Sequence, residues 1–129
     1  SLEQLCRYAD VISFHVPLTA LTKYMANDDF FSALQNRPFI INTSRGGVIE
    51  TGSLIKAIGQ DLIRGAALDV LENEKIGTLN SQEQANLDFL CAQENVLITP
   101  HIAGYSHEAY YKMSRILLQK LDIDPQEYL

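Results

Sequence analysis

The chain has 129 residues, a length that fits one modest α/β domain and leaves little room for a second. Hydrophobic residues make up 47% of the sequence and charged residues 20%, as in ordinary soluble globular proteins. The net charge of −6 argues against a nucleic-acid partner, because phosphate binding requires a basic surface, and no apolar stretch of about 18 or more residues predicts a membrane span.

Four short apolar segments are predicted to form β-strands. They are apolar almost throughout, which is typical of strands covered on both faces of a parallel sheet. Segments with helical patterns separate them, and this alternation predicts right-handed crossovers and a parallel sheet. In chain order, the predicted strands are Val11–Val16, Pro38–Thr43, Arg64–Val70 and Asn95–Thr99.

The first two connections between these strands carry signals for helix N-termini. Asn27 is a predicted N-cap, and the two aspartates that follow it suit the positive end of a helix dipole. A second helix is predicted to begin at Thr51 or Ser53 and to run to Gln60.

Two further helices are predicted in the second half of the chain. Ser81 and Gln84 have the spacing of a capping box at the start of one helix. Another is predicted from about Ser106 to Leu121, with its apolar residues at helical spacing. The polar segment Glu72–Asn80 is predicted to be a loop at the carboxyl edge of the sheet, where open α/β folds bind their ligands.

The two cysteines, Cys6 and Cys91, lack the spacing of metal ligands, and no metal site is predicted. We interpret them as reduced, half-buried thiols of a cytoplasmic protein.

Arg45 follows the second predicted strand and precedes two glycines. Glycines at such a position let the backbone turn sharply and approach a ligand closely. The planar guanidinium of Arg45 suits a carboxylate ligand. A surface arginine in a turn explains this segment equally well when it is taken alone.

Acidic and imidazole side chains follow the third and fourth predicted strands. Asp69 ends a run of small apolar residues, so we expect it to be buried with a hydrogen-bond donor as partner. Glu72 and Glu74, taken alone, would be solvated acids. His101 follows a strand end and is well placed for acid–base chemistry, although a lone histidine is more often structural.

Four segments together resemble the D-isomer-specific 2-hydroxyacid dehydrogenases, the family of D-lactate, glycerate and phosphoglycerate dehydrogenases. HVPLT, INTSRGGVI, GAALDV and ITPHIAG occur in the family's order, and the resemblance runs from Tyr8 to about Leu121. It implies an α/β Rossmann-like half domain, with about four parallel strands in sequential order and flanking helices. Residues 1–121 would be the C-terminal part of a dinucleotide-binding domain, and residues 122–129 a frayed tail.

The resemblance also implies roles for individual residues. Arg45 matches the arginine that holds the substrate's carboxylate and carbonyl. His101 matches the acid–base histidine, and Glu74 matches its carboxylate partner. We prefer Glu74 over Glu72 because its distance from Arg45 in the sequence fits the family, although Lys75 follows it where relatives often have proline. The positions that match the cofactor site are His15, Pro17, Thr43, Asp69 and Gly104.

The implied reaction is hydride transfer between a nicotinamide cofactor and a small D-2-hydroxy acid or 2-keto acid. NAD is the family's usual cofactor, with NADP left open, and relatives commonly form homodimers. The 129 residues contain neither a G-x-G-x-x-G turn nor a separate substrate domain. We therefore expect this chain to be part of a longer protein, inactive alone and weak in dinucleotide binding. A non-enzymatic interaction module, like the co-repressors of this family, is the alternative.

Overall fold

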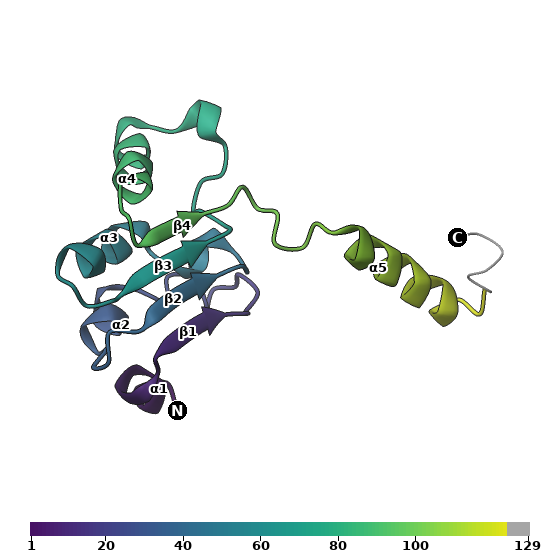
Figure 1. Cartoon of the computed structure of the whole chain (residues 1–129), viewed down its shortest axis with the longest axis horizontal. Helices are drawn as coiled ribbons and strands as arrows, with labels where there is room; N and C mark the ends of the chain where they lie inside the picture. Colours follow the sequence, from purple (N-terminus) through teal and green to yellow (C-terminus); the bar gives the residue numbers. More distant parts are fainter. Residues whose placement is uncertain (124–129) are drawn as a thin grey trace.

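Four short strands lie side by side in one parallel sheet, in their order along the chain (Figure 1). This computed structural model describes residues 1–123, apart from the side chain of Ile76. The sheet confirms the predicted Rossmann-like half domain. Each strand is shorter than its apolar segment, because the outer residues of the segment already belong to connections. The strands are β1 (Val11–Phe14), β2 (Phe39–Asn42), β3 (Gly65–Leu68) and β4 (Val96–Ile98).

The helices α2, α3 and α4 follow one another along one side of the sheet, and α4 reaches the edge strand β4 (Figure 1). The N-terminal helix α1 was not predicted, although Ser1 and Gln4 form a capping box at its start. The helices are α1 (Leu2–Tyr8), α2 (Asp28–Ser32), α3 (Thr51–Gly59), α4 (Ser81–Cys91) and α5 (His107–Lys120), with short 3₁₀ turns η1 (Gly46–Val48) and η2 (Ile76–Thr78).

Most predicted helix starts are confirmed. The Asn27 side chain caps α2 by accepting a hydrogen bond from the Phe30 N–H at 3.1 Å. α3 begins at Thr51, and Ser106 caps α5. The start predicted for α4 is wrong by one residue. Asn80 and Glu83 form the capping box there, because the Asn80 amide oxygen accepts from the Glu83 N–H at 2.9 Å.

The hydrophobic core lies between one face of the sheet and the helices beside it. Inward side chains of the strands meet two phenylalanines of α2 and leucines of α3 and α4. Full burial of one such side chain contributes roughly 1.5–3 kcal/mol relative to exposure. Residues of this core include Ile12, Phe14, Phe30, Phe31, Ile40, Leu54, Leu68 and Leu90.

The opposite face of the sheet is open in the part of the chain that the structure describes, which corrects the prediction of strands covered on both faces. Burial alternates along β1, and Val11 is 51% exposed. Phe39 and Leu97 are 45% and 62% exposed. Except for Ser13 of β1, the side chains of this face are apolar. Residue types alone do not show whether an apolar face is covered by a neighbouring element.

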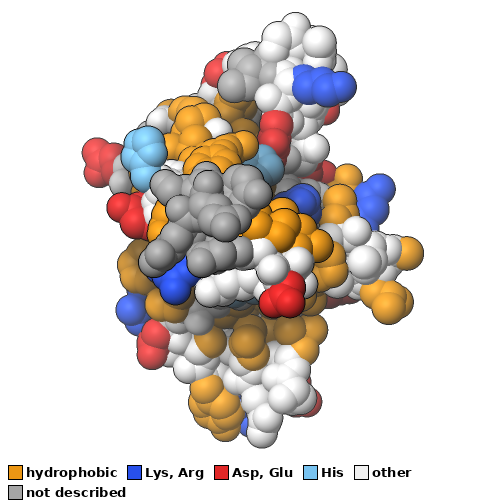
Figure 2. Space-filling model, turned by 90° about the vertical axis from the view of Figure 1, so that its right-hand side faces the viewer, with side chains coloured by type: hydrophobic (Ala, Val, Ile, Leu, Met, Phe, Trp, Pro, Cys, Tyr) orange, Lys and Arg blue, Asp and Glu red, His pale blue; other side chains and the backbone are white. Residues whose placement is uncertain are grey.

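Helix α5 extends away from the sheet, and none of its described residues is buried (Figure 1). Figure 2, which views the molecule from this side, shows apolar side chains spread over this part of the surface. Tyr110, Met113, Ile116 and Leu117 are each more than half exposed. Among residues 1–123, no helix is long and apolar enough to cross a membrane.

The two cysteines differ in environment. Cys6 is the buried residue of α1 and belongs to the core, whereas Cys91 is exposed at the end of α4. The prediction that both are half-buried is therefore wrong for each. Within the described residues, no group of three histidine, cysteine or acidic side chains could hold a metal ion.

Candidate active site

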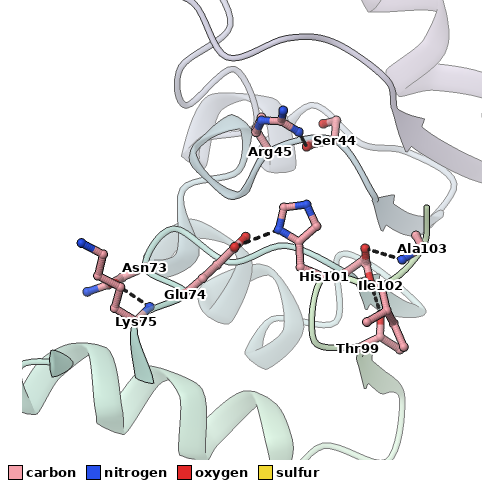
Figure 3. A network of polar contacts seen from close by, with 10 residues as sticks. Ser44, Arg45, Asn73, Glu74, Lys75, Thr99, His101, Ile102 and Ala103 are labelled. Carbon is pink, nitrogen blue, oxygen red and sulfur yellow. Dashed lines mark hydrogen bonds and ion pairs between the residues drawn. The ribbon is translucent and has the colours of Figure 1, made fainter. Parts of the chain in front are cut away.

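The loops that follow β2, β3 and β4 bring Arg45, Glu74 and His101 to one edge of the sheet (Figure 3). All strands are parallel, so their carboxyl ends share this edge, where open α/β folds place their ligands. In Figure 3 the His101 ring lies between Glu74 and the Arg45 segment. A base, its carboxylate partner and a cation therefore come from three different loops.

Glu74 and His101 are in direct contact. The Nδ1 atom of His101 lies 2.8 Å from Oε2 of Glu74, and the two side chains are 48% and 43% exposed. A carboxylate only accepts hydrogen bonds, so Nδ1 carries the proton and Nε2 is left to face a substrate. Glu72 has a different partner, because its Oε2 accepts from the Thr51 N–H at 2.8 Å. The structure therefore brings Glu74, and not Glu72, to the histidine.

The backbone of His101 is held in an unusual conformation. Its φ of 55° lies in the left-handed region, which costs a non-glycine residue on the order of 1–3 kcal/mol. The His101 N–H donates to the Thr99 carbonyl at 3.0 Å. Contacts of the neighbouring residues must offset this cost. The two residues after His101, Ile102 and Ala103, are held by hydrogen bonds to Asp69.

Asp69 holds the backbone of the two residues that follow His101. Its side chain is buried, with 5% exposure. One carboxylate oxygen accepts from the Thr99 hydroxyl and from the Ile102 N–H at 2.8 Å, and the other accepts from the Ala103 N–H at 2.9 Å. Both oxygens are thus engaged by the loop that carries the histidine.

The same contacts set the ionisation of Asp69. Burial on its own raises the pKa of this carboxyl. Hydrogen bonds from Thr99, Ala103 and Ile102, together with the charge of His101, oppose burial and bring the pKa below its ordinary value. Asp69 is therefore a buried anion stabilised by several donors.

We predict that Asp69→Asn lowers the free energy of unfolding by about 1–3 kcal/mol, because its amide NH₂ would face one of the backbone N–H donors. The folded-state pKa of Asp69 is depressed, so its charge contributes stability above the unfolded-state value, and this contribution is lost as pH falls through the folded-state value. The difference between the two proteins is expected to shrink below pH 3.8, the ordinary pKa of the group. Urea unfolding at neutral and acidic pH measures this, and a difference that stays constant would contradict it.

An open hollow of about 530 Å³ lies between the loops after β1 and β2. The Nε2 atom of His15 lies 2.8 Å from the Ser13 hydroxyl oxygen. Arg45 uses one guanidinium N–H to reach the Ser44 carbonyl at 2.7 Å, and no other hydrogen bond from its side chain is seen within the described residues. The residues that line the hollow are His15, Val16, Pro17, Leu18, Thr43, Ser44 and Arg45.

The predicted cofactor positions are not all in one place. His15, Pro17 and Thr43 line the hollow, whereas Asp69 lies beneath the His101 loop. Gly104 lies in an exposed turn ahead of α5, with no atom within 4 Å of the position of a Cβ.

The contact made by Gly46 differs from the expectation that the glycines after Arg45 let the backbone approach a ligand. A Cβ at this residue would lie 1.9 Å from the carbonyl oxygen of Leu71. The absence of a side chain at Gly46 therefore allows the loop after β2 to pack on the loop after β3, rather than on a ligand as predicted. The positions of Arg45 and Glu74 are linked through this backbone contact.

Three comparisons relate the chain to known proteins. The family described as "D-isomer specific 2-hydroxyacid dehydrogenase, NAD binding domain" matches residues 1–103. Erythronate-4-phosphate dehydrogenase of Bacteroides thetaiotaomicron is 42% identical over 126 residues, which cover 94% of this chain and 33% of that protein. The D-specific alpha-keto acid dehydrogenase of Enterococcus faecalis is 38% identical over 110 residues, covering 81% of this chain and 34% of its own length.

Solved structures show the same similarity. The D-lactate dehydrogenase of Aquifex aeolicus, in complex with NAD and lactic acid, superposes with a TM-score of 0.81 at 32% identity, over 95% of this chain and 39% of that one. D-2-hydroxyisocaproate dehydrogenase gives a TM-score of 0.79 at 29% identity, over 92% of this chain and 37% of that one. The chain thus spans about a third of the length of the relatives that it matches.

Proposed function

The chain belongs to the D-isomer-specific 2-hydroxyacid dehydrogenase family, and on this premise we propose that it forms part of an NAD-dependent oxidoreductase acting on a small D-2-hydroxy acid or 2-keto acid. The observation that carries the proposal is the 2.8 Å contact between Glu74 and His101 beside Arg45. An acid–base group with an ionic partner, facing a cation that can bind a carboxylate, suits this reaction.

The reduction of a 2-keto acid adds a hydride to the carbonyl carbon and a proton to its oxygen. NAD, when bound in its reduced form, supplies the hydride. Protonated His101 gives the proton from Nε2 and becomes neutral, while Glu74 stabilises its charged form beforehand. Arg45 binds the substrate carboxylate and stabilises negative charge that develops on the carbonyl oxygen. In the oxidation of a hydroxy acid, neutral His101 accepts the hydroxyl proton.

The hollow beside Arg45 fits the nicotinamide end of a dinucleotide. It offers Val16 and Pro17 as apolar contacts for a flat ring, and Thr43 as a polar group. Its position next to Arg45 puts a bound ring beside the substrate that Arg45 and His101 would hold. These residues would contact the cofactor directly, and Asp69 would act from beneath by supporting the His101 loop.

We assign residues 1–121 to the C-terminal part of a dinucleotide-binding domain. The span of about a third of each relative supports this assignment, and the predicted tail from residue 124 on lies outside the described residues. The 129 residues contain no G-x-G-x-x-G turn, so we expect turnover in the full-length enzyme that contains this chain. The open apolar face of the sheet, with Val11 and Phe39, supports self-association as a homodimer.

The proposal predicts a shifted pH profile for Glu74→Gln in the full-length enzyme. Glutamine keeps a hydrogen-bonding side chain but removes the charge that stabilises the imidazolium of His101. Reduction needs protonated His101, so we expect the variant to lose this activity at lower pH than the wild type. Oxidation of the hydroxy acid needs the neutral form and is expected to suffer less under alkaline conditions.

Rates measured across pH in both directions test this prediction. An unchanged profile would show that Glu74 does not act through His101. A wild-type enzyme without turnover of any small 2-keto acid in the presence of reduced NAD would overturn the proposed function itself.

A further inference from the structure

Glu72 lies where the loops that follow three consecutive strands meet, outside the reacting pair. It belongs to the loop after β3, and its Oε2 accepts a hydrogen bond from the Thr51 N–H at 2.8 Å. Thr51 is the first residue of α3, which follows β2. Glu72 thus places its negative charge at the N-terminus of a nine-residue helix that has no side-chain cap of its own.

Tyr24, in the loop after β1, lies near the same carboxylate. The Glu72 carboxylate raises the pKa of Tyr24, chiefly through hydrogen bonding and then through its charge, with smaller contributions from burial and from the charge of Glu50. The Tyr24 N–H donates to the Gly47 carbonyl at 2.8 Å, which ties this loop to the one that carries Arg45. Tyr24 adopts a φ of 52°, so its position is set by these contacts rather than by its own preference.

The position of Glu72 is transmitted to Glu74 through very little chain. Two residues of extended chain span at most about 7 Å, so Glu72 and Glu74 belong to the same short stretch of the loop after β3. The backbone just before Glu72 is fixed by Gly46, which packs on the Leu71 carbonyl. On the other side, the Asn73 side chain accepts from the Lys75 N–H at 3.1 Å and keeps the turn closed.

We propose that Glu72 is a positioning residue that holds the loop after β3 against the N-terminus of α3 at Thr51, and thereby sets the contact of Glu74 with His101. This inference rests on the proposed function, because the position of Glu74 matters for turnover only if the pair reacts. Glu72 does not touch the reacting groups. We therefore expect substitution of Glu72 to change the pH at which His101 is protonated.

The first test uses the 129-residue chain and needs no activity. The His101 imidazole is titrated by NMR in the wild type, in Glu72→Ala and in Glu74→Gln. We expect the midpoint of the Glu72→Ala titration to move to lower pH, in the direction set by Glu74→Gln. Asp69 and Arg45, which also bear charge near His101, are unchanged in these variants. Glu94→Ala removes an exposed glutamate between α4 and β4, at the edge of the sheet opposite to His101, and is expected to leave the midpoint in place.

A second variant guards against misfolding of Glu72→Ala. Glu72→Asp keeps the charge but is one methylene shorter, so it is expected to lose the Thr51 contact and to shift the His101 midpoint. Glu72→Gln keeps an oxygen that can accept from Thr51, and is expected to shift it least. If Glu72→Ala folds and its His101 titrates with the same midpoint as in the wild type, the inference is overturned. If Glu72→Ala does not fold, an unchanged midpoint in Glu72→Asp overturns it instead.

Kinetics in the full-length enzyme separate this inference from the proposed function. Glu72→Ala is expected to lower kcat for keto-acid reduction by about 10- to 100-fold, as for small displacements of a catalytic group, with its pH profile moved in the direction of Glu74→Gln. Turnover with an unmoved profile would refute the positioning role and leave the function standing. A wild type without turnover would refute the function, while the NMR titration would still decide whether Glu72 sets the pair.

Discussion

In the longer enzyme of which we propose this chain to be a part, His101→Ala is expected to lower kcat by about 10²–10⁴-fold or more, because general acid–base groups typically supply a factor of this size. The imidazole is the proposed source of the proton that the carbonyl oxygen receives. Its backbone conformation is held by Thr99 and Asp69 rather than by its own side chain. Alanine at this position is therefore expected to leave the loop in place and cofactor affinity nearly unchanged.

Steady-state rates and a cofactor titration measured together check this result. His107→Ala is a matched control, since His107 is an exposed histidine at the start of α5 and is expected to keep wild-type kcat. Loss of cofactor binding in His101→Ala, in proportion to the loss of rate, would indicate a structural role instead. Near-normal turnover would exclude His101 as the acid–base group.

Arg45→Lys is expected to lower kcat/KM for the keto acid by about 10- to 100-fold, since hydrogen bonds to charged groups contribute roughly 1.5–3 kcal/mol and an ammonium cannot reproduce a two-pronged contact with a carboxylate. The Arg45 side chain is exposed and uses one N–H on the neighbouring Ser44 carbonyl, which leaves its other donors for a ligand. We expect the larger part of the effect in KM, with a smaller decrease in kcat from poorer orientation.

Initial rates over a range of keto-acid concentrations measure both parameters. Arg37→Lys serves as a control, because Arg37 pairs with Asp61 on the surface away from the site and is expected to leave both parameters unchanged. Wild-type kinetics in Arg45→Lys would favour the interpretation of Arg45 as a surface residue of a turn.

The order of the strands could be predicted because sequence and topology are simply related in this part of the fold. Short apolar segments separated by helix caps favour parallel neighbours in chain order, and the sheet has this order. The ends of the strands were less predictable. Residues such as Val70 and Thr43 are typical of strands, yet they lie beyond β3 and β2, since the hydrogen-bonded ladder ends where the chain turns into the loops.

The placement of the site residues was predictable to a similar degree. Motif spacing favoured Glu74 over Glu72, and the structure places Glu74 against His101. The contacts that hold His101 in position were not predictable in detail. An aspartate after a buried strand indicates that donors are needed, but the sequence does not show that they are Thr99, Ile102 and Ala103, which follow another strand.

The contact between Glu74 and His101 also closes a segment of the chain that spans 27 positions and contains η2, α4 and β4. The entropy lost on closing such a segment grows only with the logarithm of its length, so doubling the length costs about 0.6 kcal/mol. Both ends are fixed by other elements, Leu71 by Gly46 and the His101 loop by Asp69. Insertions between residues 76 and 79, ahead of α4, are therefore expected to leave the carboxylate beside the imidazole, and a reporter peptide could be placed there, whereas α4 itself must keep its length because it contributes the buried Leu90 to the core.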